Sequence, residues 1–104
     1  MANPHAGEVA LAVGGEQRVA KLTLGTLAEL ETALEAGSLL ALVERFEGGT
    51  FSARDVLLVL AAGLRGGGWQ GTAADLVRAD MGLAPVAAAR AAAALLARAF
   101  AVPE

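Results

Sequence analysis

Cysteine is absent from this 104-residue chain, and histidine occurs only once. Without cysteine there are no disulfides, no thiolate nucleophiles and no cysteine-bound metals, which fits a reducing cytoplasm. The single histidine, His5, has too few neighbouring ligands for a zinc ion, which requires three or four. We therefore expect neither a metal nor a cofactor.

Charged residues are also scarce. They make up 18% of the chain against 56% hydrophobic residues, and the net charge is -3. The basic residues are spread singly, so no stripe of them could neutralise a run of nucleic-acid phosphates. The N-terminus carries neither the basic region nor the apolar stretch of a secretory signal. These features predict a cytoplasmic protein that does not bind nucleic acid.

Residues suited to catalysis are few. The only serines, Ser38 and Ser52, fit helix N-caps, and neither lies in a G-x-S-x-G setting. Glycines cluster between Gly63 and Gly71. However, no Gly-Lys-Ser/Thr follows, and the cluster comes after an expected helix, so the context of a phosphate-binding loop is missing. We interpret the cluster as a helix C-cap and a hinge, and we expect that the protein is not an enzyme.

Only one apolar run, residues 83–102, is long enough to be tested as a membrane span. It contains Arg90 and Arg98, and each arginine would cost about 2.5 to 3.5 kcal/mol at the centre of a membrane span. A second apolar run, residues 56–64, is far shorter than the roughly 20 residues that a bilayer requires. We therefore expect no membrane span.

The clearest positive signal is a helix within residues 50–68. Ser52 is a favoured N-cap, Asp55 follows three residues later, and Arg65 places a positive charge near the C-terminal end. Residues 56–64 are apolar on every side of the helix, apart from one glycine. A helix of this kind is buried, so we predict that it forms the centre of the core.

The N-terminal segment predicts a β-hairpin. Residues 8–13 alternate between apolar and other residues, as a half-buried strand does, and residues 14–17 supply a turn. A four-residue loop would place Val9 opposite Leu22, whereas a three-residue loop would place it opposite Lys21. We favour the four-residue loop, because it joins the apolar faces of both strands.

Four more helices are expected around the central one, each with a cap or stop signal and most with an apolar stripe. The first helix is expected to begin at Thr23 or Thr26, where Thr26 and Glu29 also fit a capping box, and to end at Gly37. The second begins at Ser38 and ends at Gly48–Gly49. The third runs from Thr72 through Met81 and stops at Gly82, and the fourth runs from Pro85 to about Ala101. The apolar stripe of the first helix is Leu27, Leu30 and Leu34. That of the second is Leu39, Val43 and Phe46, with Glu44, Arg45 and Glu47 facing water. The alanine-rich fourth helix has one bulky edge of Leu95, Leu96 and Phe100.

The predicted fold class is α+β and mostly α, with an N-terminal β-hairpin followed by about five short helices around a central buried helix. We expect a single domain over residues 1–104. Within it, residues 1–7 form a flexible arm, 8–24 the hairpin and 25–104 the helical part.

Four blocks of sequence carry a resemblance to a known family. They are A-N-P-H-A-G-E-V at residues 2–9, L-T-L-G-T-L-A-E-L-E at 22–31, E-R-F-E-G-G-T-F-S-A-R-D at 44–55 and A-G-L-R-G-G-G at 62–68. Together they resemble the small tail protein of gene transfer agents, the phage-like particles of alphaproteobacteria, and of related prophages. The alanine-rich sequence after Gly71 adds little to this resemblance.

The resemblance implies either a tail tube protein or a tail assembly chaperone. A tube subunit needs a substantial β-sheet for the ring around the lumen, whereas this chain predicts two strands and five helices. We therefore expect a chaperone that binds the tape measure protein and assists the tail tube subunits. The alternative is a structural component of the tail, associated with the particle. A small regulatory adaptor unrelated to tails is a third possibility.

Partner binding would use apolar residues that the core does not need, as in helix-in-groove recognition. The candidates are Leu39, Leu40, Phe46, Phe51, Trp69 and Phe100. Trp69 is interpreted either as an anchor on the core or as an exposed contact residue. Phe51 also fits a hydrophobic staple against Val56 or Leu57. The free edges of the hairpin leave room for a homo-oligomer formed by strand pairing.

Overall fold

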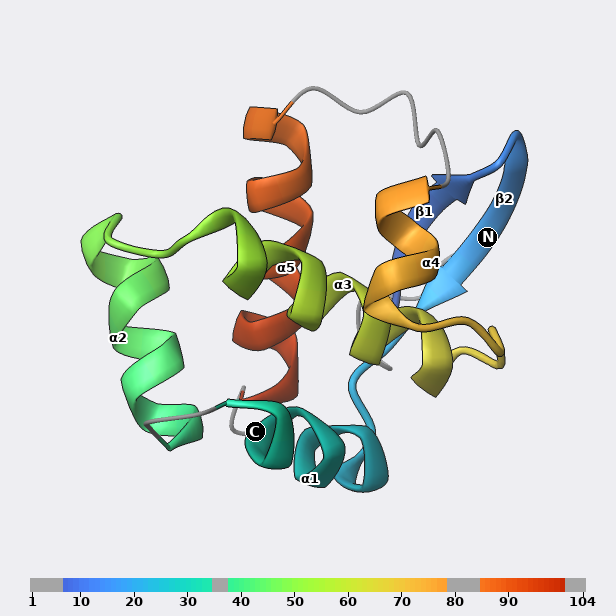
Figure 1. Ribbon diagram of the computed structural model, residues 1–104. Helices are drawn as coiled ribbons and strands as arrows, with labels where there is room; N and C mark the ends of the chain where they lie inside the picture. Colours follow the sequence, from blue (N-terminus) through green and yellow to red (C-terminus); the bar gives the residue numbers. More distant parts are fainter. Residues whose placement is uncertain (1–6, 35–37, 79–84, 101–104) are drawn as a thin grey trace.

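A computed structural model describes residues 7–34, 38–78 and 85–100 (Figure 1). Within these ranges, strands β1 (Val9–Val13) and β2 (Glu16–Ala20) are followed by helices α1 (Leu24–Ala33), α2 (Leu39–Gly48), α3 (Ala53–Gly66), α4 (Ala73–Arg78) and α5 (Pro85–Ala99). This order confirms the predicted α+β, mostly helical fold class. The predictions for His5, Gly37, Met81, Gly82 and Ala101 concern positions outside the described residues.

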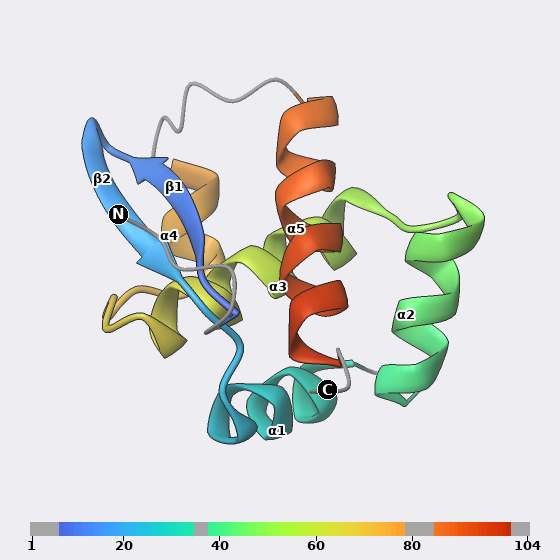
Figure 2. The same cartoon turned by 180° about the vertical axis from the view of Figure 1, so that it is seen from behind.

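Helix α3 lies at the centre of the molecule and packs against α1, α4, α5 and β2 (Figures 1 and 2). Its N-cap is Ser52, and Asp55 closes the predicted capping box. Val59, Leu60 and Leu64 are almost fully buried, which confirms α3 as the core helix. Leu57 and Leu58 are only half-buried, so one side of α3 is less covered than expected.

The hairpin differs from the predicted register. Val9 lies opposite Ala20 and Val13 opposite Glu16, so the loop contains only two residues, Gly14 and Gly15. Both glycines have positive φ, at 58° and 84°. A two-residue turn with positive φ at both positions matches the right-handed twist of the strands. The predicted four-residue loop, and the three-residue alternative, are therefore wrong.

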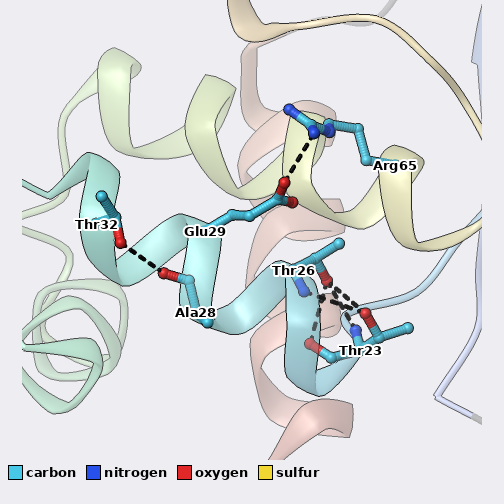
Figure 3. A network of polar contacts seen from close by, with 6 residues as sticks. All are labelled: Thr23, Thr26, Ala28, Glu29, Thr32 and Arg65. Carbon is cyan, nitrogen blue, oxygen red and sulfur yellow. Dashed lines mark hydrogen bonds and ion pairs between the residues drawn. The ribbon is translucent and has the colours of Figure 1, made fainter.

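The start of α1 is fixed by two threonines (Figure 3). Thr23 is the N-cap: its Oγ1 accepts a hydrogen bond from the N–H of Thr26, at 3.1 Å, and its own N–H donates to Thr26 Oγ1 at 2.8 Å. The capping box thus joins these two residues, and the predicted box between Thr26 and Glu29 does not form. Glu29 instead forms an ion pair with Arg65 of α3, with 2.8 Å between Oε1 and the guanidinium.

The other helix ends follow their local signals. Ser38 caps α2 through the N–H of Ala41, and Gly49 ends the helix with a φ of 73°. Thr72 and Asp75 exchange hydrogen bonds at the start of α4. Pro85 is the first residue of α5, as its fixed φ favours.

Helix α2 is placed differently from its predicted orientation. Its fully buried residue is Leu42, whereas the predicted stripe of Leu39, Val43 and Phe46 is half-buried. Arg45 was expected to face water, but its side chain is only 33% exposed and pairs with Asp55. The orientation of α2 brings Arg45 to Asp55, where its positive charge compensates a buried carboxylate.

The C-terminal end of α3 lies directly on the backbone of β2. The N–H of Lys21 donates to the carbonyl of Gly63 at 2.8 Å. A Cβ atom on Gly66 would lie 1.8 Å from the carbonyl oxygen of Lys21, and one on Gly67 would lie 1.8 Å from that of Val19. Gly67 is the C-cap, as predicted. In this structure the two glycines form a close packing contact, which the hinge interpretation did not anticipate.

Candidate functional site

An apolar groove separates α2 from α5. It consists of two adjoining hollows of about 460 and 360 Å³ that share Phe46 and Ala93. The first is also lined by Phe51, Pro85, Val86, Ala89 and Arg90, and the second by Val43, Glu47, Leu96, Ala97 and Phe100. We call this feature the α2–α5 groove.

One wall of the groove is a pair of stacked aromatic rings. Phe46 near the end of α2 and Phe51 just before α3 have ring centroids 4.7 Å apart and an interplanar angle of 5°. The chain reverses between them at Gly49, whose positive φ a larger side chain rarely adopts. The glycine break predicted from the sequence therefore builds the aromatic wall. The predicted staple of Phe51 on Val56 or Leu57 stays a prediction.

The opposite wall is the face of α5 that carries Ala89, Ala93 and Ala97. These residues are four apart, so they lie above one another on one side of the helix. Their small side chains leave the groove open along its length. Val86 and Phe100, in the two hollows, are 62% and 47% exposed. Large apolar side chains exposed beside an apolar hollow make the groove the candidate surface for binding another molecule.

An ion pair holds α2 to the start of α3. Arg45 Nε lies 3.0 Å from Asp55 Oδ2, and its Nη2 lies 3.0 Å from Oδ1, so the contact is bidentate. The hydrogen bonds from Arg45, and after them the N–H of Ser52, lower the pKa of Asp55 from its ordinary value of 3.8. The pKa of Arg45 is raised by the same contact. A bidentate arginine fixes distance and orientation, so the pair sets the position of the groove wall on α2.

This ion pair predicts a specific dependence of stability on acid. The pKa of Asp55 is lower in the folded than in the unfolded chain. The ionised carboxylate therefore stabilises the fold above its ordinary pKa, and this stabilisation is lost as the pH falls through the pKa of the folded chain. We expect the free energy of unfolding to decrease between roughly pH 5 and pH 2. In Asp55→Asn this decrease should be shallower, with a loss of about 2 kcal/mol at neutral pH. Urea unfolding over a pH series measures both.

Glu16→Gln is the control for this experiment, because Glu16 forms an exposed ion pair with Arg18 and exposed pairs contribute little. It should keep the acid dependence of the wild type. An acid dependence equally steep in Asp55→Asn and in the wild type would contradict the assignment.

The structure brings three of the six candidate binding residues together. Phe46, Phe51 and Phe100 line the α2–α5 groove. Leu39 is half-buried and packs on the core, and Leu40 is exposed on α2 without lining the groove.

Trp69 lies away from the groove, beyond the C-terminal end of α3. Its backbone N–H donates to the carbonyl of Leu64 at 2.9 Å, and its half-buried ring packs against the core. A Cβ on Gly71 would lie 2.2 Å from that ring. This arrangement agrees with the interpretation of Trp69 as an anchor.

Sequence reasoning missed the α5 wall of the groove. Val86 carried a usable signal, since it is a bulky residue in the first turn of an alanine-rich helix. The position of Ala89 and Ala93 opposite Phe46 depends on how α2 and α5 are placed, and no local pattern contains that information. Within the described ranges no cluster of acidic and histidine side chains could hold a metal ion, and no helix is long and apolar enough to cross a membrane.

Comparison with known proteins supplies the family. The profile of the family described as "Phage tail tube protein, GTA-gp10" matches residues 6–102. No curated protein and no solved structure matches the chain. The matched range contains the hairpin, all the helices described above and both walls of the groove, so it extends through the alanine-rich half that the four sequence blocks left uncovered. The chain therefore belongs to this family of phage and gene transfer agent tail proteins.

Proposed function

We propose that this protein is a tail assembly chaperone that binds the tape measure protein and assists assembly of the tail tube. The observation that carries the proposal is the α2–α5 groove, an open apolar surface on a tail-family protein. A long helical partner has an apolar stripe that must be covered before assembly. Helix-in-groove binding covers such a stripe.

The shape of the groove suits a helix. α2 and α5 run side by side in opposite directions (Figures 1 and 2). A third helix laid between them could rest on Ala89 and Ala93, whose small side chains allow close approach, while Phe46 and Phe51 cover its flank. The partner would then insert bulky apolar side chains at helical spacing.

The fold favours the chaperone over a tube subunit. The sheet formed by the described residues has only two strands, and a ring of tube subunits requires a larger sheet. A structural role predicts stoichiometric amounts of the protein in purified particles, whereas a chaperone should be absent or present in traces. Mass spectrometry of particles separates the two.

A matched pair of substitutions tests the groove. Val86 in the groove and Val77 on α4 are 62% and 66% exposed, and only Val86 lines the groove. Val86→Glu should weaken capture of a co-expressed tape measure fragment at least about tenfold, because binding would bury an unpaired carboxylate. Val77→Glu should bind as the wild type does. Pull-down followed by titration of the purified fragment measures the difference.

The outcomes separate the alternatives clearly. Undiminished capture by Val86→Glu would remove the groove from the site, while equal loss in both variants would indicate a general effect of the added charge. Circular dichroism of both variants checks folding.

We also propose that the protein acts by binding alone, in the cytoplasm of the producing bacterium. Both serines are engaged as helix caps, which supports a role without nucleophilic catalysis.

A further inference from the structure

The outer edge of β1 carries unpaired backbone groups. In an antiparallel pair, every second residue directs its N–H and C=O toward the neighbouring strand, and the residues between direct them outward. The two-residue loop closes at Val13 and Glu16, so Glu8, Ala10 and Ala12 direct these groups outward. The carbonyl of Glu8 accepts a hydrogen bond from Arg98. For Ala10 and Ala12 the described residues supply no hydrogen-bond partner on this edge.

The opposite edge of the hairpin is closed. On β2 and just beyond it, the outward residues are Gln17, Val19 and Lys21. Lys21 donates to Gly63, and Gly66 and Gly67 lie against the carbonyls of Lys21 and Val19. The end of α3 thus covers most of this edge. A new strand could add only at β1.

We propose that β1 pairs antiparallel with β1 of a second copy of this chain, about a two-fold axis at Leu11. The strand reads Val-Ala-Leu-Ala-Val and is the same in both directions. An antiparallel partner centred on Leu11 therefore places Val9 opposite Val13, Ala10 opposite Ala12 and Leu11 opposite itself. The sequence is complementary to itself at every position.

The same register satisfies the free backbone groups. Ala10 of one copy and Ala12 of the other would exchange N–H and C=O hydrogen bonds, and the symmetric pair would do the same. A shift of two residues in one direction would bring in the Glu8 carbonyl, which Arg98 already occupies, and a shift in the other direction would pair Ala10 with Gly14, a turn residue with a φ of 58°. The register centred on Leu11 pairs Ala10 and Ala12 with strand residues alone and uses no occupied group.

Arg98 of α5 covers the Glu8 end of this edge, but two common protections against pairing are absent from β1 itself. Exposed edges are commonly guarded by charged residues or proline, and β1 contains neither. Ala10 is exposed, and both alanines are too small to obstruct a neighbouring strand. Two such hairpins would form one four-stranded sheet. Helix α2 and the hairpin lie on opposite sides of α5 (Figure 1), so a partner in the α2–α5 groove and a second copy on β1 would approach from different sides.

Two opposed residues provide the test. Ala12 and Gln17 face each other across the hairpin, and the N–H of each points outward from its own edge. Ala12→Pro removes an N–H needed for pairing and should abolish the dimer. Gln17→Pro makes the same change on the other edge and should leave the dimer intact. Sedimentation velocity at increasing concentration should show weak, reversible dimers of the wild type, because the paired edge is short.

Lysine substitutions guard against a folding defect. Ala12→Lys keeps the backbone N–H but adds a charge to the edge, so it should also yield monomers, with Gln17→Lys as its control. A wild type that stays monomeric at high concentration would overturn the proposal. Dimers that survive both Ala12 substitutions would overturn it as well.

The absence of cysteine allows a direct test of register. A mixture of Ala10→Cys and Ala12→Cys proteins should form a mixed disulfide on mild oxidation, because these positions would be direct neighbours across the axis. Each variant alone should crosslink far less, since its own copies would be diagonal. Efficient crosslinking of either variant with itself would exclude the register centred on Leu11.

Discussion

Gly67→Ala is expected to destabilise the protein by about 3 kcal/mol, near the upper end of the usual cost of overpacking. The φ angle of Gly67 is -90°, which any residue adopts, so backbone strain is not the reason. The added methyl group would lie 1.8 Å from the carbonyl oxygen of Val19. Because that atom belongs to the backbone of β2, the strand and α3 must separate. Thermal unfolding should show a melting temperature lower by on the order of 10 °C.

Gly48→Ala is the control for this prediction. Gly48 is the last residue of α2, and a Cβ there would meet no atom within 4 Å. The change should be neutral or slightly stabilising, because alanine favours helix by up to about 1 kcal/mol relative to glycine. Equal melting temperatures for the two variants would show that the contact between Gly67 and β2 is not tight.

Leu95→Ala should cost about 3 kcal/mol of unfolding free energy, within the usual range for a buried leucine. Leu95 is fully buried, and its methyl groups lie where a Cβ on Gly63 of α3 would be, at 2.7 and 3.2 Å. Truncation would leave a cavity between α3 and α5 that neither backbone can close alone. Chemical denaturation measures the loss.

The neighbouring glycine makes this prediction more specific. Gly63→Ala alone should crowd Leu95, whereas in the double variant its methyl group would occupy part of the vacated space. The double variant should therefore lose less stability than the sum of the two single variants. Simple additivity would mean that the two positions do not share this space.

The parts of the fold that the sequence predicted correctly have local causes. Ser52 and Asp55 are three residues apart, so their capping box follows from spacing alone. The predicted hairpin register was wrong because the four-residue loop was favoured for joining the apolar faces of both strands, while two adjacent glycines are already sufficient for the turn. The competing local signals could not be ranked without the backbone.

The remaining features depend on contacts between distant residues. Arg45 and Asp55 lie on different helices, and their pairing requires the reversal at Gly49. The α2–α5 groove depends on where α2 comes to rest beside α5. Phe46, Phe51 and Phe100 could be named from the sequence as bulky residues near helix ends. That these three residues meet in one groove could not be predicted from the sequence.

The contact between Arg98 and the carbonyl of Glu8 joins positions 90 residues apart in the chain. It places α5 beside β1, so the end of the helical part lies on the N-terminal hairpin. α5 also supplies Ala92, Leu95 and Leu96 to the core. Without α5, the apolar surface of α3 that faces it would be uncovered. We therefore expect chains truncated before α5 to expose this surface and to be rapidly degraded.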